Sequence, residues 1–204
     1  MALVDRVKGI LMSPRAEWQV IDAEPATVSS LYAGYIAPLA LIPAVCSAIG
    51  MALIGVSIPF VGGTYKTPMG SALTSAAVMY VFGLVAVFIV ALIIDALAPT
   101  FAGTKNQVQA LKVVAYSYTA SWVGGIFSLI PGLRWVGFIF ALYSLYLLYL
   151  GLPVLMKSPA DKALGYTVVV IICAIIVMAV VGIAIASMGF GMGVNPMAGA
   201  GYHP

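Results

Sequence analysis

Residues 143–166 read YSLYLLYLGLPVLMKSPADKALGY, and this stretch decides the fold. An apolar run with regularly spaced tyrosines ends at Lys157, and a second apolar run leaves after a short charged link. Ser158 and Asp161 have the spacing of a capping box, and Pro159 occupies the first position of the helix that such a box would start. The stretch therefore predicts two long apolar helices joined by a tight, charged turn.

The chain of 204 residues is 63% hydrophobic and 7% charged, whereas soluble domains carry about 25% charged residues. One small domain cannot hide that much apolar surface from water, so we expect membrane lipid to surround the chain. A net charge of +3 could indicate a nucleic-acid partner. The basic residues are scattered between apolar runs, however, which is the pattern that encodes membrane topology, and we expect no nucleic-acid partner.

Five apolar runs are each long enough to cross a hydrocarbon core of about 30 Å. We therefore expect an all-α fold, a polytopic membrane helical bundle of five transmembrane helices preceded by N-terminal amphipathic helices. The third run opens with capping-box spacing at Thr104 and Gln107 and is the most polar of the five, so we expect it inside the bundle. The expected spans cover about residues 31–58, 72–97, 105–130, 135–156 and 158–188.

The chain is expected to have three parts. Residues 1–30 form a cytoplasmic amphipathic segment, residues 31–188 the five-span membrane domain, and residues 189–204 a disordered extracytoplasmic tail rich in glycine and methionine. In the first part we expect two short helices on the membrane surface, with Trp18 at the depth of the lipid headgroups and Arg15 on the polar side. The alternative is a partly ordered lead-in to the first span.

The distribution of lysine and arginine predicts the orientation. With the N-terminus inside, seven of these residues lie on the inner side and two, Lys66 and Arg134, on the outer side. The positive-inside rule then places the N-terminus in the cytoplasm and the C-terminus outside, in a bacterial inner membrane.

Two residues of opposite charge lie in neighbouring expected spans. Asp95 is near the cytoplasmic end of the second span, and Lys112 is about two turns into the third helix, which starts on the same side. We expect the two to meet, because a carboxylate at that depth needs a partner or water. This contact is interpreted as an ion pair that fixes one hairpin, with a binding or proton site as the alternative.

Tyrosines mark the third and fourth spans. Tyr143, Tyr146 and Tyr149 recur every three residues, which at about 100° per residue places them on one face of the helix. Such stripes usually pack with the phenol bonded to a neighbouring backbone group, and the alternative is that they line a polar cavity. Tyr116 and Tyr118 add further hydroxyls to the third span.

The sequence contains no catalytic constellation. Its single histidine, His203, is next to the last residue, so a Ser-His-Asp set is not expected, and no glycine-rich phosphate loop is present. Cys46 and Cys173 lie in apolar runs and are expected to pack as small hydrophobic side chains. We therefore expect no enzymatic activity, no metal site and no cofactor.

Four stretches carry a family resemblance: SPRAEWQVIDAEPA (13–26), LAPTFAGTKNQVQALKVVAYSYT (97–119), FSLIPGL (127–133) and the opening stretch at 143–166. They resemble the Yip family, named for Ypt/Rab-interacting proteins, and specifically its bacterial inner-membrane branch. The resemblance implies a five-span helical membrane protein that works through partners or lipids rather than through chemistry. In eukaryotes the family is linked to small GTPases and Golgi traffic.

Two departures from the family pattern are visible. The eukaryotic Asp-Leu-Tyr-Gly-Pro motif ahead of the first span is absent, which argues against GTPase binding. Residues 116–122 read YSYTASW, without the proline that bacterial relatives are expected to carry after the threonine. We therefore expect a straighter third helix than in those relatives.

These observations favour a non-enzymatic protein whose cytoplasmic face binds a partner protein or anionic lipid headgroups and organises membrane. Besides the residues above, Lys157, Asp161, Lys162 and Tyr166 are candidates for this role. The alternative is a small-solute or ion transporter or channel, or a lipid scramblase, that uses the polar third span and Asp95. Homo-oligomers are a further expectation, through a small-residue stripe at Ala44, Ala48 and Ala52.

Overall fold

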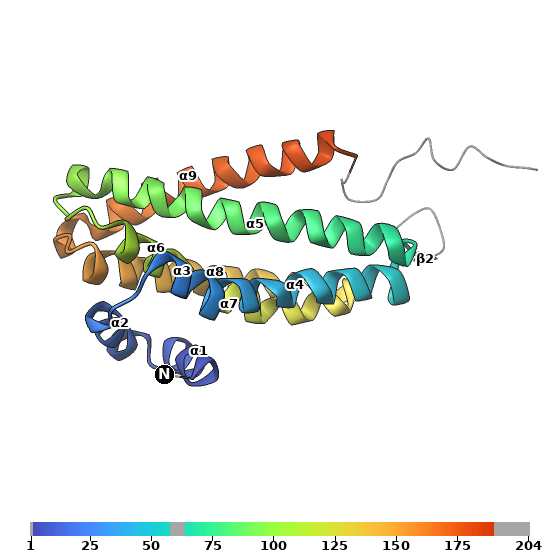
Figure 1. Ribbon diagram of the computed structural model, residues 1–204, viewed down its shortest axis with the longest axis horizontal. Coiled ribbons are helices and arrows are strands. Elements are labelled where there is room, and N and C mark those ends of the chain that lie inside the picture. Colours follow the sequence, from blue (N-terminus) through green and yellow to red (C-terminus); the bar gives the residue numbers. More distant parts are fainter. Residues whose placement is uncertain (1, 58–63, 190–204) are drawn as a thin grey trace, which may run out of the picture.

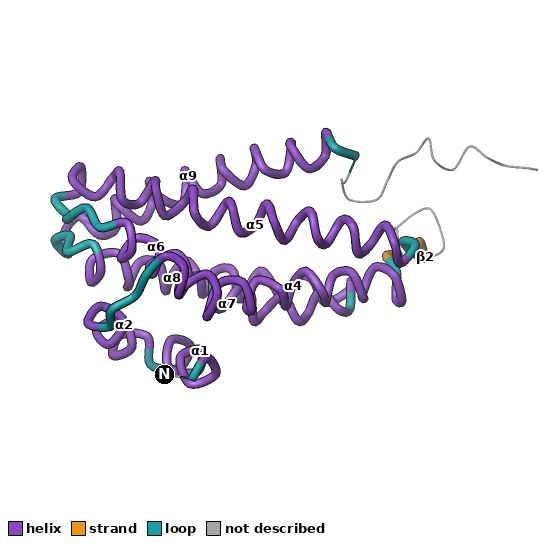
Figure 2. The backbone as a smooth tube through the Cα atoms, in the orientation of Figure 1, coloured by secondary structure: helices purple, strands orange, loops and turns teal. Residues whose placement is uncertain are grey.

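The computed structural model describes residues 2–57 and 64–189. Nearly all of this backbone is helical, and a two-residue antiparallel β ladder lies at one end of the molecule (Figure 2). Residues 190–204 of the expected tail lie outside the described residues. The α-helices are α1 (Leu3–Met12), α2 (Pro14–Ala23), α3 (Val28–Leu31), α4 (Ala37–Ile49), α5 (Met69–Leu97), α6 (Gln107–Ser117), α7 (Thr119–Gly124), α8 (Arg134–Leu155) and α9 (Ala160–Ser187). The π-helical turns are η1 (Tyr32–Ile36) and η2 (Gly50–Ile54), the 3-10 turns are η3 (Ala98–Phe101), η4 (Gly125–Leu129) and η5 (Pro131–Leu133), and the strands are β1 (Val56–Ser57) and β2 (Thr64–Tyr65).

Among the described residues, four continuous helical segments are long and apolar enough to cross a membrane. They correspond to the first, second, fourth and fifth expected spans. The first of them runs from α3 through η1 and α4 to η2, and its backbone widens to a π-helix just before Pro38, which has no N–H to donate. The four segments are Val28–Ile54, Met69–Phe101, Trp135–Leu155 and Ala160–Ser187.

The third expected span, residues 105–130, is not one continuous helix. It consists of α6, α7 and the 3-10 turn η4, and α6 and α7 are separated at Tyr118, where ψ is −9°. The Thr119 hydroxyl lies 3.4 Å from the Ala115 carbonyl oxygen and 2.7 Å from the Tyr35 hydroxyl. A threonine that bonds back to the preceding turn bends a helix, so this segment is interrupted although no proline follows the threonine. That it is straighter than in bacterial relatives stays a prediction.

The helix α6 forms the centre of the molecule. It contacts α3, α5 and α8, and every residue from Ala110 to Ser117 is buried. Figure 1 shows α5 and α9 side by side along one side of the bundle, with α4, α7 and α8 along the other. The prediction that the third segment lies inside the bundle is therefore confirmed. In the first span Ala48 is buried within the protein itself, so this part of the small-residue stripe packs inside the chain.

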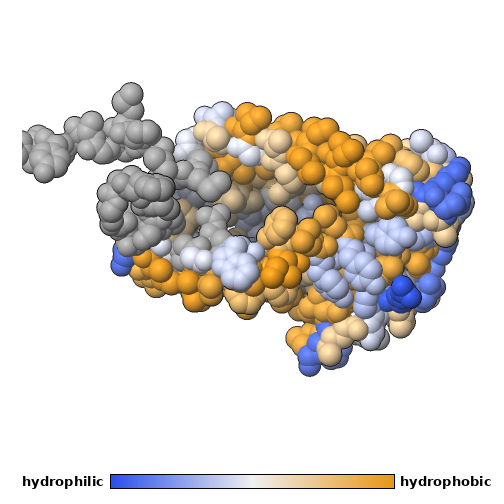
Figure 3. All heavy atoms as spheres, turned by 180° about the vertical axis from the view of Figure 1, so that it is seen from behind, coloured by the Kyte–Doolittle hydropathy of each residue, from blue (hydrophilic) through white to orange (hydrophobic). Residues whose placement is uncertain are grey.

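One end of the bundle gathers most of the charge. The end of α5, the start of α6, the end of α8 and the start of α9 meet there, and we call it the charged end (Figure 1). The helices α1 and α2 lie outside the bundle close to it. Figure 3 shows hydrophilic residues at this end and hydrophobic residues over the flank, which is the surface that a membrane-spanning bundle presents to lipid.

The two predicted capping boxes are wrong. The first turn of α6 is capped by Asn106, whose side chain accepts a hydrogen bond from the Gln109 N–H at 3.1 Å. Asn106 is nearer to the free N–H groups than Thr104, whose own N–H donates to the Met156 carbonyl at 2.8 Å. The helix α9 has no side-chain cap, and the Ser158 hydroxyl is buried without a hydrogen bond within the described chain.

Candidate functional site

The helices α1 and α2 pack on the bundle through an aromatic anchor. Trp18 of α2 is fully buried and meets the Tyr116 ring edge to face, with 6.3 Å between the ring centroids. Its indole lies on Gly151 of α8, and α2 and α8 are in contact along this face. Protein therefore covers the apolar face of α2 at Trp18, and the depth of Trp18 in the membrane stays a prediction.

Gly151 is needed for this close approach. A Cβ atom placed on it would lie 2.7 Å from a carbon of the buried Trp18 indole. Replacing Gly151 with alanine is expected to destabilise the protein by about 1–3 kcal/mol, the usual cost of overpacking. The measurement is thermal or denaturant unfolding in detergent micelles. Gly137→Ala, also in α8 but with nothing within 4 Å of its Cβ position, serves as the control that should not lose stability.

Arg6 of α1 holds α1, α2 and the following loop together. Its guanidinium forms ion pairs with Glu17 of α2 and with Glu24 just beyond α2. It also lies over the Tyr116 ring, with 5.7 Å between the guanidinium carbon and the ring centroid. Arg6 is buried, so its charge is compensated by two carboxylates and an aromatic face rather than by water.

Lys112 caps the C-terminal end of α2. Its side chain is buried, with 3% of the residue exposed, and its ammonium donates to the carbonyl oxygens of Ile21, at 2.8 Å, and Glu24. A cation at a helix C-terminus is favourable because the last carbonyls of a helix have no partner inside it. The helices α5 and α6 are neighbours as expected, but the predicted Asp95–Lys112 pair is wrong because Lys112 faces α2. One carboxylate oxygen of Asp95 is buried without a hydrogen bond among the described residues.

Asp22 joins α2 to two further parts of the charged end. Its carboxylate pairs with Lys157, which follows α8, and accepts a hydrogen bond from the Gln109 amide at 3.1 Å. The same amide lies 3.2 Å from the Asp22 carbonyl oxygen. These contacts fasten α2 to α6 and to the end of α8. We call the whole set the docking network, and it consists of Arg6, Glu17, Asp22, Glu24, Gln109, Lys112 and Lys157.

The tyrosine stripe of α8 serves three different purposes. Tyr143 donates to the Leu11 carbonyl at 2.7 Å and so binds α1, as expected for a packing phenol. Tyr146 is exposed and stacks at a tilt on Tyr143, with 5.7 Å between the centroids. Tyr149 is also exposed and borders a cleft beside α2. The stripe therefore does not line a common polar cavity.

The remaining candidate residues are spread over the molecule. Tyr116 packs on Tyr35 with 4.5 Å between the centroids, in the core. Tyr166 is fully buried, donates to the Ile94 carbonyl and stacks on Phe101. Tyr118 borders two cavities within the spans. Asp161 and Lys162 are exposed at the start of α9, and neither makes an ion pair within the described chain.

A cleft of about 370 Å³ opens at the charged end between α2, the end of α8 and the start of α9. We call it the α2 cleft. Arg15 and Gln19 are exposed and supply polar groups, while Leu150, Pro153 and Val154 supply an apolar wall. Trp18 also borders it, and the indole N–H is buried without a hydrogen-bond partner among the described residues. The remaining lining residues are Tyr149, Ala160 and Ala163.

Comparison with known proteins identifies the family. The family model for the Yip1 domain matches residues 8–183, which is most of the chain. The chain belongs to the Yip1 family. It is also 28% identical over 169 residues to the "Inner membrane protein YohC" of Escherichia coli K12 and to the protein of the same name in E. coli O6:H1, with 80% of this chain and 85% of each relative covered. No solved structure matches. The Yip1 match begins within α1 and includes all of α2, so the docked α2 is part of the family's domain.

Sequence reasoning missed most of the docking network. The sequence predicts membrane-surface helices for residues 1–30, and it assigns no separate role to Arg6, Glu17, Asp22 and Glu24 within them. Four of the chain's six acidic residues lie in the first 24 positions. This concentration of acids is unusual for a segment that is expected to lie on anionic lipid, and it was the signal for contacts within the protein. Those acids indicate that the segment faces cations of its own chain.

Proposed function

We propose that this Yip1-family protein is a non-catalytic inner-membrane protein that binds the headgroups of anionic lipids in its α2 cleft, at the cytoplasmic face. The observation that carries the proposal is Arg15. Its exposed guanidinium borders a cleft with an apolar wall and makes no ion pair within the described chain. An amphipathic cleft with one free cation suits a ligand with an acyl chain and a phosphate.

The proposed orientation follows from the charge distribution. Seven of the nine lysines and arginines belong to the charged end or to α1 and α2 beside it, and Lys66 and Arg134 belong to the opposite end. The positive-inside rule therefore favours a cytoplasmic charged end. We count the broken segment α6–α7–η4 as a fifth span that packs inside the other four, which places the N-terminus inside and the C-terminus outside.

The docking network explains why Arg15 is a better candidate than Lys112 or Lys157. Arg6, Lys112 and Lys157 are already paired within the protein. Arg15 is free, and Lys162 lies exposed in the same turn as Ala163, which borders the cleft. An arginine can hold a phosphate through two parallel hydrogen bonds, and the buried N–H of Trp18 offers a further donor.

Reversing the charge of Arg15 tests this proposal. Arg15→Glu is expected to weaken retention of phosphatidylglycerol by the detergent-purified protein about fivefold or more, since each basic residue near an anionic surface contributes about 1 kcal/mol. Retention is measured by native mass spectrometry against phosphatidylcholine. Lys105→Glu is the matched control, because it makes the same change of charge at an exposed residue outside the cleft. Equal losses in both variants, or no loss in either, would refute the site.

The transport alternative has less support. Two cavities within the spans are bordered mainly by apolar side chains, with a few hydroxyls and no charged residue in either lining. An ion or polar solute would lose its hydration there without compensation. Asp95 lines neither cavity.

A further inference from the structure

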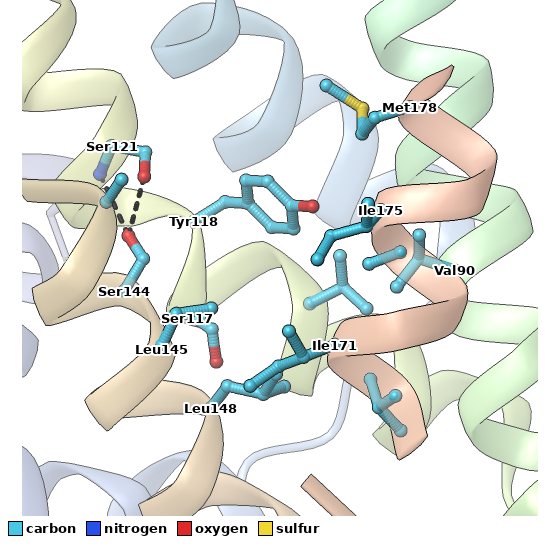
Figure 4. Close-up of a pocket in the computed structure, with 14 residues that line it drawn as sticks. Val90, Ser117, Tyr118, Ser121, Ser144, Leu145, Leu148, Ile171, Ile175 and Met178 are labelled. Carbon is cyan, nitrogen blue, oxygen red and sulfur yellow. Dashed lines mark hydrogen bonds between the residues drawn. The ribbon is translucent and has the colours of Figure 1, made fainter. Parts of the chain in front are cut away.

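A cavity of about 300 Å³ lies in the middle of the bundle, bordered by α5, α6, α8 and α9 (Figure 4). Its size is at the lower end of ligand pockets, which occupy about 300–1,000 Å³ and combine apolar walls with a few placed polar groups. It is separate from the α2 cleft and shares no lining residue with it.

Two hydroxyls of this cavity make no hydrogen bond to any described residue. Ser121 and Ser144 satisfy each other, with 2.8 Å between their hydroxyl oxygens (Figure 4). Ser117 is only 2% exposed, and its hydroxyl is buried with no hydrogen bond among the described residues. The Tyr118 hydroxyl points across the cavity towards α9 (Figure 4) and also makes no hydrogen bond within the described chain. A buried hydroxyl without a partner is costly, so Ser117 favours a ligand that accepts a hydrogen bond, and Tyr118 offers a second donor at the same cavity.

The two hydroxyls lie inside the bundle, well away from the charged end. Ser117 is ten residues beyond the start of α6 at the charged end, which at about 1.5 Å per residue is about 15 Å along the helix. A charged phospholipid headgroup does not suit this position, because no charged residue is present in the lining to compensate it.

The mouth of the cavity faces hydrocarbon. Leu145 of α8 and Ile175 and Met178 of α9 border the cavity and are exposed on the surface of the bundle. Figure 3 shows a hollow on one flank among hydrophobic residues. No charged residue borders the cavity. A ligand must therefore be uncharged and enter sideways from the membrane.

We propose that this cavity binds a prenyl quinone, with the ring carbonyls accepting hydrogen bonds from Ser117 and Tyr118. The ring is uncharged, offers acceptor oxygens, and can enter from the membrane because the rest of the molecule is hydrocarbon. A second cavity of about 280 Å³, reaching towards α4, shares Tyr118 and Met178 in its lining and provides space for part of the isoprenoid tail. Diacylglycerol carries its polar group near the membrane surface and fits less well.

The experiment titrates detergent-purified protein with decylubiquinone and follows the bound fraction by native mass spectrometry, with dioleoylglycerol as a parallel probe. The double variant Ser117→Ala, Tyr118→Phe is expected to bind decylubiquinone about tenfold more weakly, since each net hydrogen bond contributes a few-fold in affinity. Ala174→Phe, which fills the cavity from α9, is expected to abolish binding.

Two variants control for effects outside the cavity. Tyr146→Phe removes an exposed phenol that does not border it, and Ala179→Phe places the same bulky ring on the exposed side of α9. Both should bind as the unaltered protein does. The proposal is overturned if the unaltered protein does not bind decylubiquinone, if dioleoylglycerol binds as tightly, or if the double variant binds unchanged. Phosphatidylglycerol retention reports on the α2 cleft separately.

Discussion

Replacing Arg6 with methionine is expected to release α1 and α2 from the bundle. The substitution leaves Glu17 and Glu24 without their cation, and breaking a buried ion pair from one side costs about 3–5 kcal/mol. The loss should lie near the lower end of that range because the Glu24 side chain is 38% exposed and can be hydrated. Hydrogen exchange of the amides in residues 3–23 measures the effect, because local release of these helices raises exchange there before the bundle opens.

Lys8→Met is the matched control for this prediction. Lys8 is an exposed lysine on α1 that makes no ion pair within the described chain. Its replacement therefore removes the same charge as Arg6→Met and leaves the docking network unchanged. Its amides should exchange as in the unaltered protein. If Arg6→Met leaves exchange in α1 and α2 unchanged, the ion pairs do not hold these helices in place.

Replacing Lys112 with methionine is expected to loosen the end of α2. Methionine preserves the volume of the buried stem and removes the cost of burying an ammonium, but the carbonyls of Ile21 and Glu24 lose their donor. Each carbonyl left unpaired costs about 1–3 kcal/mol where water cannot replace the donor. The expected result is faster exchange of the α2 amides and a lower unfolding temperature in detergent.

The substitution Asp95→Asn distinguishes the contact of Lys112 with α2 from the Asp95–Lys112 ion pair that the sequence predicts. Asp95 makes no hydrogen bond to Lys112, so its neutralisation should leave exchange in α2 unchanged. In the double variant Lys112→Met, Asp95→Asn, the two changes in the free energy of unfolding should add, because residues without shared partners act independently. Strong coupling between the two substitutions would instead show that Asp95 and Lys112 interact.

The long helices were predictable because apolar runs of more than about 18 residues have few other solutions in proteins. The four continuous segments follow those runs closely, from Val28–Ile54 to Ala160–Ser187. The family was predictable as well, from the order and spacing of stretches such as residues 143–166. The break at Tyr118 was not, because it depends on a hydroxyl of Thr119 that meets Tyr35, a residue 84 positions away.

The packing of α2 on the bundle could not be predicted from the sequence. An amphipathic helix needs a cover for its apolar face, and membrane lipid and protein satisfy the same pattern. Trp18 packs on Gly151 because this glycine has no side chain, and Gly151 belongs to a helix that starts more than a hundred residues later. A single sequence does not connect the two positions. For the same reason Lys112 was assigned to its near neighbour Asp95 rather than to carbonyls of α2.

The docking network also dictates an order of assembly during synthesis. Asp22 pairs with Lys157, which follows it by 135 residues. At about 5–20 residues per second, roughly 7–27 s pass between the synthesis of these two partners. Gln109, Lys112 and Tyr143 must also be made before α1 and α2 can close on the bundle. The helices α1 and α2 therefore complete their contacts only after α8 has been made, and Asp22 has no lysine partner until Lys157 follows.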